Sequence, residues 1–442
     1  MTATRTTHAR VWRLAGPIIV SNLSVPLLGA VDTAVMGHLP DPAYIGGVAI
    51  GGLVFSYIYW GFGFLRMGTT GFVAQAAGAK DADEVRAVLA RGLILAAGFG
   101  GLVIALQLPV ALAAFAIIEA SDKVESLAST YLFIRIWGAP AALANYVAIG
   151  WLIGMQRTGA TFALTVFLNG VNIALSLLFV VGFGWGIEGV AAATLIAEWS
   201  AALLALALIG ARLKHVGGAW RWALIRARAR LVRMLRVNFD IFIRTLCLLT
   251  AFAWFTAQGA KFGDTVLAAN AVLLIFQTFI GHGLDGFAHA AEALVGNAIG
   301  ARDRAAVRSA VAVSTVWAGI VAALFALVYL VGGTAIVALL TSIESVRATA
   351  HVYLVYVIVS PLLSVWSYQL DGIFIGATRT AEMRNAMMIS LAAFIAAEQV
   401  LVPLHGNHGL WLALLVFMVV RALTLGIWYP RIERATAPAE AG

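Results

Sequence analysis

Residues Arg212–Arg236 read RLKHVGGAWRWALIRARARLVRMLR and lie near the middle of a 442-residue chain. The stretch contains no acid, and its basic residues are Arg212, Lys214, Arg221, Arg226, Arg228, Arg230, Arg233 and Arg236. Basic runs also occur in nucleic-acid-binding proteins. Here, however, apolar segments of membrane-spanning length flank the run on both sides, and positive charge in that position retains a loop in the cytoplasm. We therefore interpret residues 212–236 as a cytoplasmic linker between two membrane-embedded halves, and we expect no nucleic-acid partner.

The composition excludes a water-soluble fold. Hydrophobic residues make up 62% of the chain and charged residues 11%, whereas a soluble domain has about 45–50% apolar and about 25% charged residues. The formal net charge of +8 reflects membrane topology instead of nucleic-acid binding. The single cysteine, Cys247, excludes an intrachain disulfide and a cysteine-based metal cluster. The chain is predicted to be an integral membrane protein.

Hydropathy and helix breakers predict twelve membrane spans. All should be helical, because an unpaired backbone is costly in lipid. The first is interpreted as a retained span, since its apolar run continues past Gly29 without a clear cleavage site. The predicted spans are 12–37, 45–76, 87–112, 125–154, 159–183, 187–211, 237–259, 265–298, 307–331, 345–376, 382–403 and 408–429.

The distribution of Lys and Arg predicts the orientation. If the N-terminus lies inside and the spans alternate, the loops on the outside hold only Lys123, Lys261 and Arg347. Nearly all other basic residues then fall in cytoplasmic loops, as the positive-inside rule requires. Both termini are therefore predicted to be cytoplasmic.

The two halves carry the same sequence pattern. GAKDADEVR at Gly78–Arg86 matches GARDRAAVR at Gly300–Arg308, with an offset of 222 residues. The same offset relates a second group of pairs: Tyr131 with Tyr353, Tyr146 with Tyr368, Gly150 with Gly372, Gly154 with Gly376, Arg157 with Arg379, and Thr158 with Thr380. A shift of six spans keeps the membrane orientation, so the repeat is parallel. We predict two lobes of six helices, a plan that transporters use for alternating access.

Ionisable residues inside spans are candidates for function, because a charge at mid-bilayer costs roughly 2.5–3.5 kcal/mol even on insertion scales. Asp32 is the strongest candidate, since no basic residue lies within one helical turn of it. Pro26, six residues earlier, can kink the helix and act as a gating point. A carboxylate placed in this way can take up a proton or a cation on one side and release it on the other. The alternative is that the Asp32 carboxyl group stays neutral and contributes only to helix packing.

Polar side chains also line the fifth and sixth spans. Asn169, Asn172 and Ser176 are spaced by three and four residues and share a helix face, and Thr194 lies on the next span. These groups can bind an ion or relay protons with Asp32. They can equally hold helices together.

The second half has its own set of candidates. Asp240 and Arg244 are four residues apart, and we expect them to pair. Asp285, His289 and Glu292 share one helix face, where proton exchange is favoured over a divalent metal. Tyr368 and Asp371 share a face of the tenth span, and Ile149 stands at the position equivalent to Asp371. We expect these residues to line a cavity in the C-terminal lobe: Asp240, Arg244, Asp285, His289, Glu292, Tyr368 and Asp371.

Several catalytic motifs are absent from the sequence. It contains no GxxxxGK[ST] phosphate loop, no HExxH and no GxSxG, which are the signatures of nucleotide hydrolysis, zinc peptidases and serine hydrolases. We predict no enzymatic activity and no cofactor or resident metal. Transport, if active, must use an ion gradient.

The chain resembles the multidrug and toxic compound extrusion (MATE) family, in its DinF-like branch. The resemblance spans nearly the whole chain. It rests on VPLLGAVDTAVMGHL around Asp32, the GAKDADEVR and GARDRAAVR loops, LNGVNIALSLLFVVGFGWGIEGVAAAT from Leu168, DIFIRT from Asp240, and LDGIFIGATRT from Leu370.

The resemblance implies a multidrug efflux antiporter that exports organic, lipophilic or cationic compounds in exchange for H⁺ or Na⁺. Asp32 matches the family's coupling aspartate, and Asn172 and Thr194 match its partners. Ser176 stands where many relatives have a second aspartate, which favours H⁺ over Na⁺. Asp371 matches an acid of a C-lobe cation site. The alternatives are Na⁺ coupling and a flippase for an anionic lipid-linked precursor, which Arg66, Arg135 and Arg244 would suit.

The expected organisation is an N-lobe at 1–211, the basic linker at 212–236 and a C-lobe at 237–442. The protein is expected to be a monomer in a bacterial inner membrane. Its partners are then the lipid bilayer and small-molecule drugs or toxins.

Overall fold

The structure is a computed structural model that describes the backbone of residues 6–36, 41, 43–118 and 120–436, and their side chains except 24–34 and 36. Every regular element in these ranges is a helix. Among the described residues, eleven helices or consecutive helix pairs are long and apolar enough to cross a membrane. Helix α1 (His8–Met36) covers the first of the predicted spans. The all-helical membrane fold expected from composition is confirmed, and the chain is a multi-pass membrane protein.

The chain divides into two compact units. The N-terminal unit is Val20–Met234, and the C-terminal unit is Leu235–Gly442 together with Met1–Ile19. The beginning of α1 thus groups with the C-terminal half, not with the rest of the N-lobe. Trp12 explains this grouping, because its ring packs edge-on against Phe287 at 5.3 Å and Trp317 at 5.2 Å between ring centroids. Such aromatic pairs add stability beyond the area they bury.

The unit Val20–Met234 contains helices that are shorter than the predicted spans. The predicted span 45–76 is two helices, and 125–154 is interrupted by a 3₁₀ turn before Pro140, which lies in the first turn of the next helix. The elements are α2 (Ala43–Gly61), α3 (Phe64–Gly78), α4 (Ala82–Ala105), α5 (Gln107–Ile117), α6 (Asp122–Arg135), η1 (Ile136–Gly138), α7 (Ala139–Gly154), α8 (Thr158–Ser176), the π-helical η2 (Leu177–Gly182), α9 (Ile187–Val216) and α10 (Trp222–Ile225).

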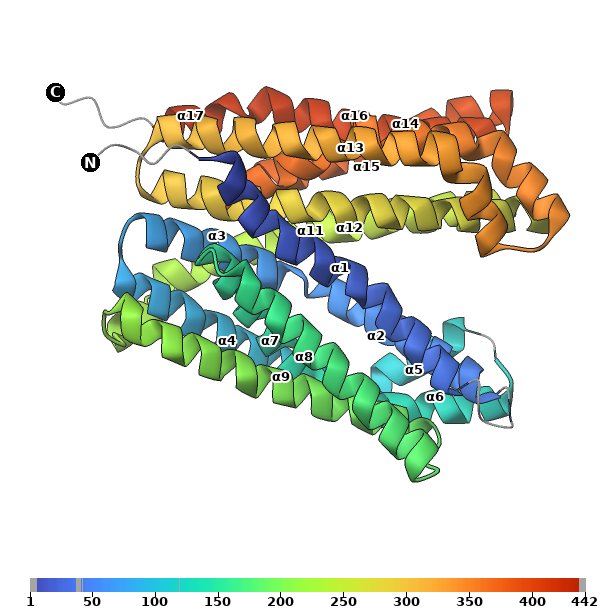
Figure 1. Ribbon diagram of the computed structural model, residues 1–442, viewed down its shortest axis with the longest axis horizontal. Coiled ribbons are helices and arrows are strands. Elements are labelled where there is room, and N and C mark those ends of the chain that lie inside the picture. The colour runs from blue at the N-terminus through green and yellow to red at the C-terminus, as the bar shows by residue number, and fades with distance from the viewer. Residues whose placement is uncertain (1–5, 37–40, 42, 119, 437–442) are drawn as a thin grey trace. The chain divides into compact units, whose positions relative to one another are not determined.

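The C-terminal unit has longer helices. Helix α13 continues nine residues beyond the predicted end at 331, and α11 already begins within the predicted linker. The elements are α11 (Arg228–Ala260), α12 (Asp264–Gly300), α13 (Arg304–Leu340), α14 (Glu344–Gly376), α15 (Thr380–His405), α16 (Asn407–Trp428) and α17 (Pro430–Ala435). Within this unit, α12 and α13 both pack along α14, and α15 packs along α16 (Figure 1).

Close helix packing at equivalent glycines supports the internal repeat. A Cβ on Gly150 of α7 would lie 2.4 Å from the Arg66 carbonyl oxygen of α3, and a Cβ on Gly372 of α14 would lie 2.3 Å from that of Ala288 in α12. Gly372 and Ala288 lie 222 residues after Gly150 and Arg66, which is the offset found in the sequence. Both lobes therefore use a glycine to bring their second and fourth spans into backbone contact.

The GAKD and GARD loops have the same geometry. Lys80 and Arg302, the third residues of the two motifs, have φ values of 58° and 53°. The aspartate that follows caps the next helix in each case: Asp81 accepts from the Glu84 N–H and Asp303 from the Ala306 N–H, both at 2.9 Å. The repeat thus extends to hydrogen bonds and backbone conformation.

The basic linker folds against the first GAKD loop. Arg86 donates to the carbonyl oxygens of Leu213 and Gly217, both at 2.7 Å. Asp83 pairs with Arg221 at 2.5 Å, and Glu84 pairs with Arg230. Two acids in the first turn of α4 therefore neutralise part of the linker charge and fix its path.

Candidate functional site

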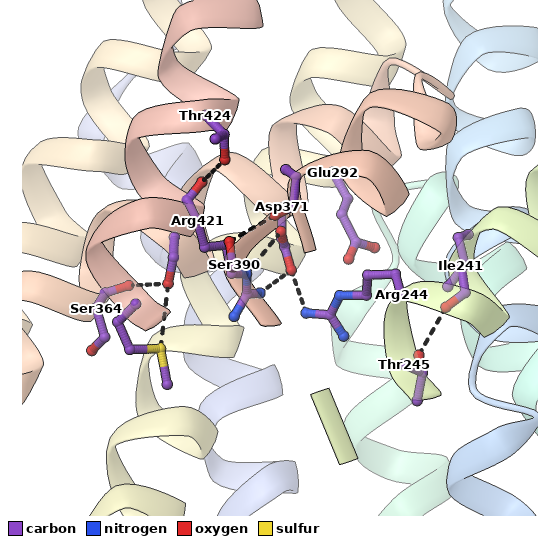
Figure 2. A network of polar contacts seen from close by, with 12 residues as sticks. Ile241, Arg244, Thr245, Glu292, Ser364, Asp371, Ser390, Arg421 and Thr424 are labelled. Carbon is purple, nitrogen blue, oxygen red and sulfur yellow. Dashed lines mark hydrogen bonds and ion pairs between the residues drawn. The ribbon is translucent and has the colours of Figure 1, made fainter. Parts of the chain in front are cut away.

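A buried charge network lies in the C-terminal unit. Asp371 on α14 is paired with Arg244 from α11 and with Arg421 from α16 (Figure 2). The Arg421 Nε donates to Asp371 Oδ1 at 3.4 Å. Relative exposures are 1% for Arg421, 5% for Asp371 and 8% for Arg244. Buried charges persist only when paired, so this network joins three helices through one carboxylate.

The expected pairing of Asp240 with Arg244 is wrong. Asp240 accepts hydrogen bonds from Thr380 Oγ1 at 3.0 Å and from Arg384 Nη1 at 2.6 Å, both on α15. Arg244, one turn later on α11, reaches Asp371 instead. A spacing of four residues places two side chains on one face, but partners on neighbouring helices hold these two apart.

Tyr368 lies one turn before Asp371 and contributes an aromatic face to the network. The Arg421 guanidinium stands 5.6 Å from the centroid of its ring. A cation over an aromatic ring is stabilised by about 0.5–2 kcal/mol, and more when it is desolvated. The sequence prediction that Tyr368 and Asp371 belong to one cluster therefore agrees with the geometry.

Helix α12 carries the second acidic group of this unit. Glu292 is 1% exposed and His289 is 8% exposed, and His289 Nε2 lies 4.0 Å from Glu292 Oε1. Asp285, two turns before Glu292, is half-buried. In Figure 2 the Glu292 carboxylate points toward the Arg244 side chain. Within the described ranges no group of three His, Cys, Asp or Glu residues has the arrangement of a metal site.

The polar groups predicted on the fifth and sixth spans meet. Asn172 Nδ2 donates to Thr194 Oγ1 at 2.8 Å, and Thr194 Oγ1 donates to the Val190 carbonyl oxygen at 3.0 Å. Asn172 and Ser176 have no exposed surface. Asn172 Oδ1 and Ser176 Oγ have no hydrogen-bond partner within the described part of the chain, and such atoms favour a ligand, an ion or water. Asn169 is only half-buried.

Asp32 and Pro26 lie on the helical backbone of α1, but their side chains are outside the described residues. Ser176 is the last residue of α8, directly before the π-helical turn η2. Single π turns inside helices are frequent at functional sites. The N-terminal unit therefore combines a buried, under-bonded polar cluster with irregular helix geometry.

An ion pair that sequence spacing did not single out lies in the same unit. Arg135 Nη2 on α6 is 3.7 Å from Glu198 Oε1 on α9. The two residues are 63 positions apart, and no helical spacing links them. Charged residues inside predicted spans were the only available signal. Both lobes thus connect their fourth and sixth spans by an arginine–carboxylate pair, with the charges exchanged: Arg135–Glu198 in one and Asp371–Arg421 in the other.

A family model described as MatE matches residues 17–178 and 241–404, one match in each half. The chain is 43% identical to DNA damage-inducible protein F of Escherichia coli, over 95% of this chain and 91% of the relative. It is 30% identical to the "Probable multidrug resistance protein NorM" of Caulobacter vibrioides, over 71% of this chain and 68% of the relative.

Solved structures share the fold. A crystal structure of MATE in complex with MaL6 superimposes with a TM-score of 0.86 at 20% identity, covering 97% of each chain. A MOP superfamily transporter from Pyrococcus furiosus, described as having a binding pocket of reverse polarity, superimposes with a TM-score of 0.85 at 19% identity, covering 98% of this chain and 97% of that one.

Proposed function

Because this chain belongs to the MatE family of multidrug efflux transporters, we propose that it exports organic compounds in exchange for protons, with Asp32 as the coupling carboxylate. It is a transporter and not an enzyme. The alternating-access cycle requires that proton and substrate disfavour one another, since only negative coupling yields exchange. Asn169, Asn172, Ser176 and Thr194 shape the pocket in which Asp32 takes up its proton, and Pro26 allows α1 to bend.

The buried Asn172 amide is the observation that carries this proposal. Its nitrogen is bonded to Thr194, which leaves Oδ1 as an acceptor without a donor among the described residues. A protonated carboxyl group supplies the missing donor, whereas a carboxylate supplies none. In this proposal the Asp32 carboxyl group is that donor, so the polar cluster favours its protonated state. Sodium coupling is the alternative, because amide and hydroxyl oxygens also bind Na⁺.

The C-terminal unit supplies substrate recognition in this proposal. Two guanidinium groups neutralise Asp371, so the attraction for a cationic, lipophilic substrate comes from Asp285 and Glu292. The transporter works as a monomer in the bacterial inner membrane, with both termini in the cytoplasm.

Asp32→Asn tests the coupling role. The variant keeps the size of the side chain and removes the titratable group. We expect normal membrane insertion and loss of drug-resistance export. Asp264→Asn, at an exposed acid that begins α12, is the matched control and should export normally. Wild-type export by Asp32→Asn contradicts the proposal.

A second candidate is a flippase for an anionic lipid-linked precursor. Arg244 and Arg421 together carry one more charge than Asp371, which would suit a phosphate. Competition separates the two functions: cationic dyes should inhibit export if the first is correct, and anionic lipid precursors if the second is.

A further inference from the structure

The Arg135 guanidinium sits in a cage of aromatic rings inside the N-terminal unit. Its central carbon lies 4.6 Å from the centroid of Phe55, 5.6 Å from that of Tyr131 and 5.9 Å from that of Tyr59. Arg135 Nη1 also donates to the Tyr131 hydroxyl at 2.9 Å. Aromatic faces stabilise a desolvated cation, so Arg135 is held in place independently of its carboxylate partner.

Glu198 is poorly satisfied by comparison. It is 6% exposed, and its contact with Arg135 at 3.7 Å is an ion pair too long for a strong hydrogen bond. Its other oxygen, Oε2, has no hydrogen-bond partner in the described ranges, and the same holds for the buried Tyr59 hydroxyl and Asn145 Oδ1. A buried carboxylate normally repays its desolvation through several good hydrogen bonds.

The backbone makes room for this carboxylate. A Cβ on Gly138 of η1 would lie 2.1 Å from Glu198 Oε2. Asn145 Nδ2 on α7 donates to the Glu198 carbonyl oxygen at 3.0 Å and anchors the same turn of α9. The helix break between α6 and α7 therefore provides the space that the Glu198 carboxylate occupies.

We propose that Glu198 is a second proton-exchanging carboxylate of the N-terminal unit, with Arg135 as its fixed counter-charge. The inference rests on the proposed function, proton-coupled export. Charged Glu198 pairs with Arg135. On proton uptake the ion pair is lost and the Glu198 carboxyl group becomes a hydrogen-bond donor. Asn145 Oδ1 and the Tyr59 hydroxyl are buried groups without a hydrogen-bond partner in the described ranges, and they can accept from it.

The charged and titratable groups around Glu198 come from four helices. They are Arg135 and Tyr131 on α6, Tyr59 on α2, Tyr146 on α7 and, further away, Arg66 on α3. The tyrosines stay neutral at physiological pH, and the arginines stay charged. Among these groups Glu198 is the carboxylate, and we assign the change of charge to it.

Substrate-induced proton release tests the proposal. Purified protein in weakly buffered detergent solution is mixed with a cationic dye, and released protons are measured with a pH indicator. Glu198→Gln should release about half as many protons per dye as the wild type, because one of two coupled carboxylates is gone. Glu398→Gln is the matched control, since Glu398 is 4% exposed and lies in a membrane helix; it should release the wild-type number.

Arg135→Gln provides an independent readout. Without the counter-charge, the carboxylate holds its proton more tightly, so the pH midpoint of this proton release should rise by about one unit. Release from Glu198→Gln that equals the wild type at every pH, or an unchanged midpoint in Arg135→Gln, overturns the proposal. Full release by Asp32→Asn with reduced release by Glu198→Gln would instead refute the role of Asp32 and leave that of Glu198 intact.

Discussion

Arg86 and Arg308, 222 residues apart, each bind a segment at or just after the end of the sixth helix of their own lobe. Arg86 donates to the Leu213 and Gly217 carbonyl oxygens at the end of α9. Arg308 pairs with Glu433 of α17, after α16, at 2.8 Å. The arginine that follows each GAxD motif is therefore a clamp between the start of the third span of its lobe and the lobe's C-terminal end. These two arginines therefore have a structural role.

Removing the clamp should destabilise the lobe. We expect Arg86→Gln to lower the free energy of unfolding by about 1–2 kcal/mol, since charged hydrogen bonds at a partly exposed site are screened by solvent. Thermal unfolding in detergent measures the effect. Lys214→Gln, in the same linker but exposed, is the control and should unfold like the wild type. Equal unfolding temperatures for all three proteins would show that the clamp contributes nothing.

The buried network should depend more on its carboxylate than on either arginine. Asp371→Asn removes the carboxylate that pairs with both Arg244 and Arg421, and it should lower the free energy of unfolding by about 3–5 kcal/mol. Arg244→Gln leaves the Asp371–Arg421 pair intact and should cost less than half of that. Chemical unfolding of both variants provides the comparison. A larger loss in Arg244→Gln than in Asp371→Asn would contradict the arrangement in Figure 2.

The glycine contacts allow a paired test of the repeat. Gly150→Ala and Gly372→Ala each place a methyl group within 2.4 Å of a carbonyl oxygen on a neighbouring helix. Each should therefore lower the free energy of unfolding by about 1–3 kcal/mol. Gly319→Ala, on α13, meets nothing within 4 Å and should stabilise the helix by about 0.5–1 kcal/mol. Unfolding curves of the three variants measure these changes. Similar changes in the free energy of unfolding for Gly372→Ala and Gly319→Ala would count against close packing of α12 on α14.

Periodicity and hydropathy predicted the helical membrane fold and its repeat, but not the breaks within the spans 45–76 and 125–154. The membrane spans follow from apolar length, and the repeat follows from one constant offset, because both signals are local or depend on residue identity alone. The partners of buried charges were harder to predict. Asp240 and Arg244 satisfy the helical spacing rule, yet each pairs with another helix. Arg135 and Glu198 lie on different helices, so their contact follows only from tertiary packing.

The central claim is that an inward proton flux drives export. Efflux of a fluorescent cation from proteoliposomes measures this directly, with a pH gradient and a Na⁺ gradient imposed in separate experiments. We predict that the pH gradient alone drives transport, that the Na⁺ gradient at equal pH does not, and that Asp32→Asn abolishes the response. Transport driven by Na⁺ and indifferent to the pH gradient would contradict the account.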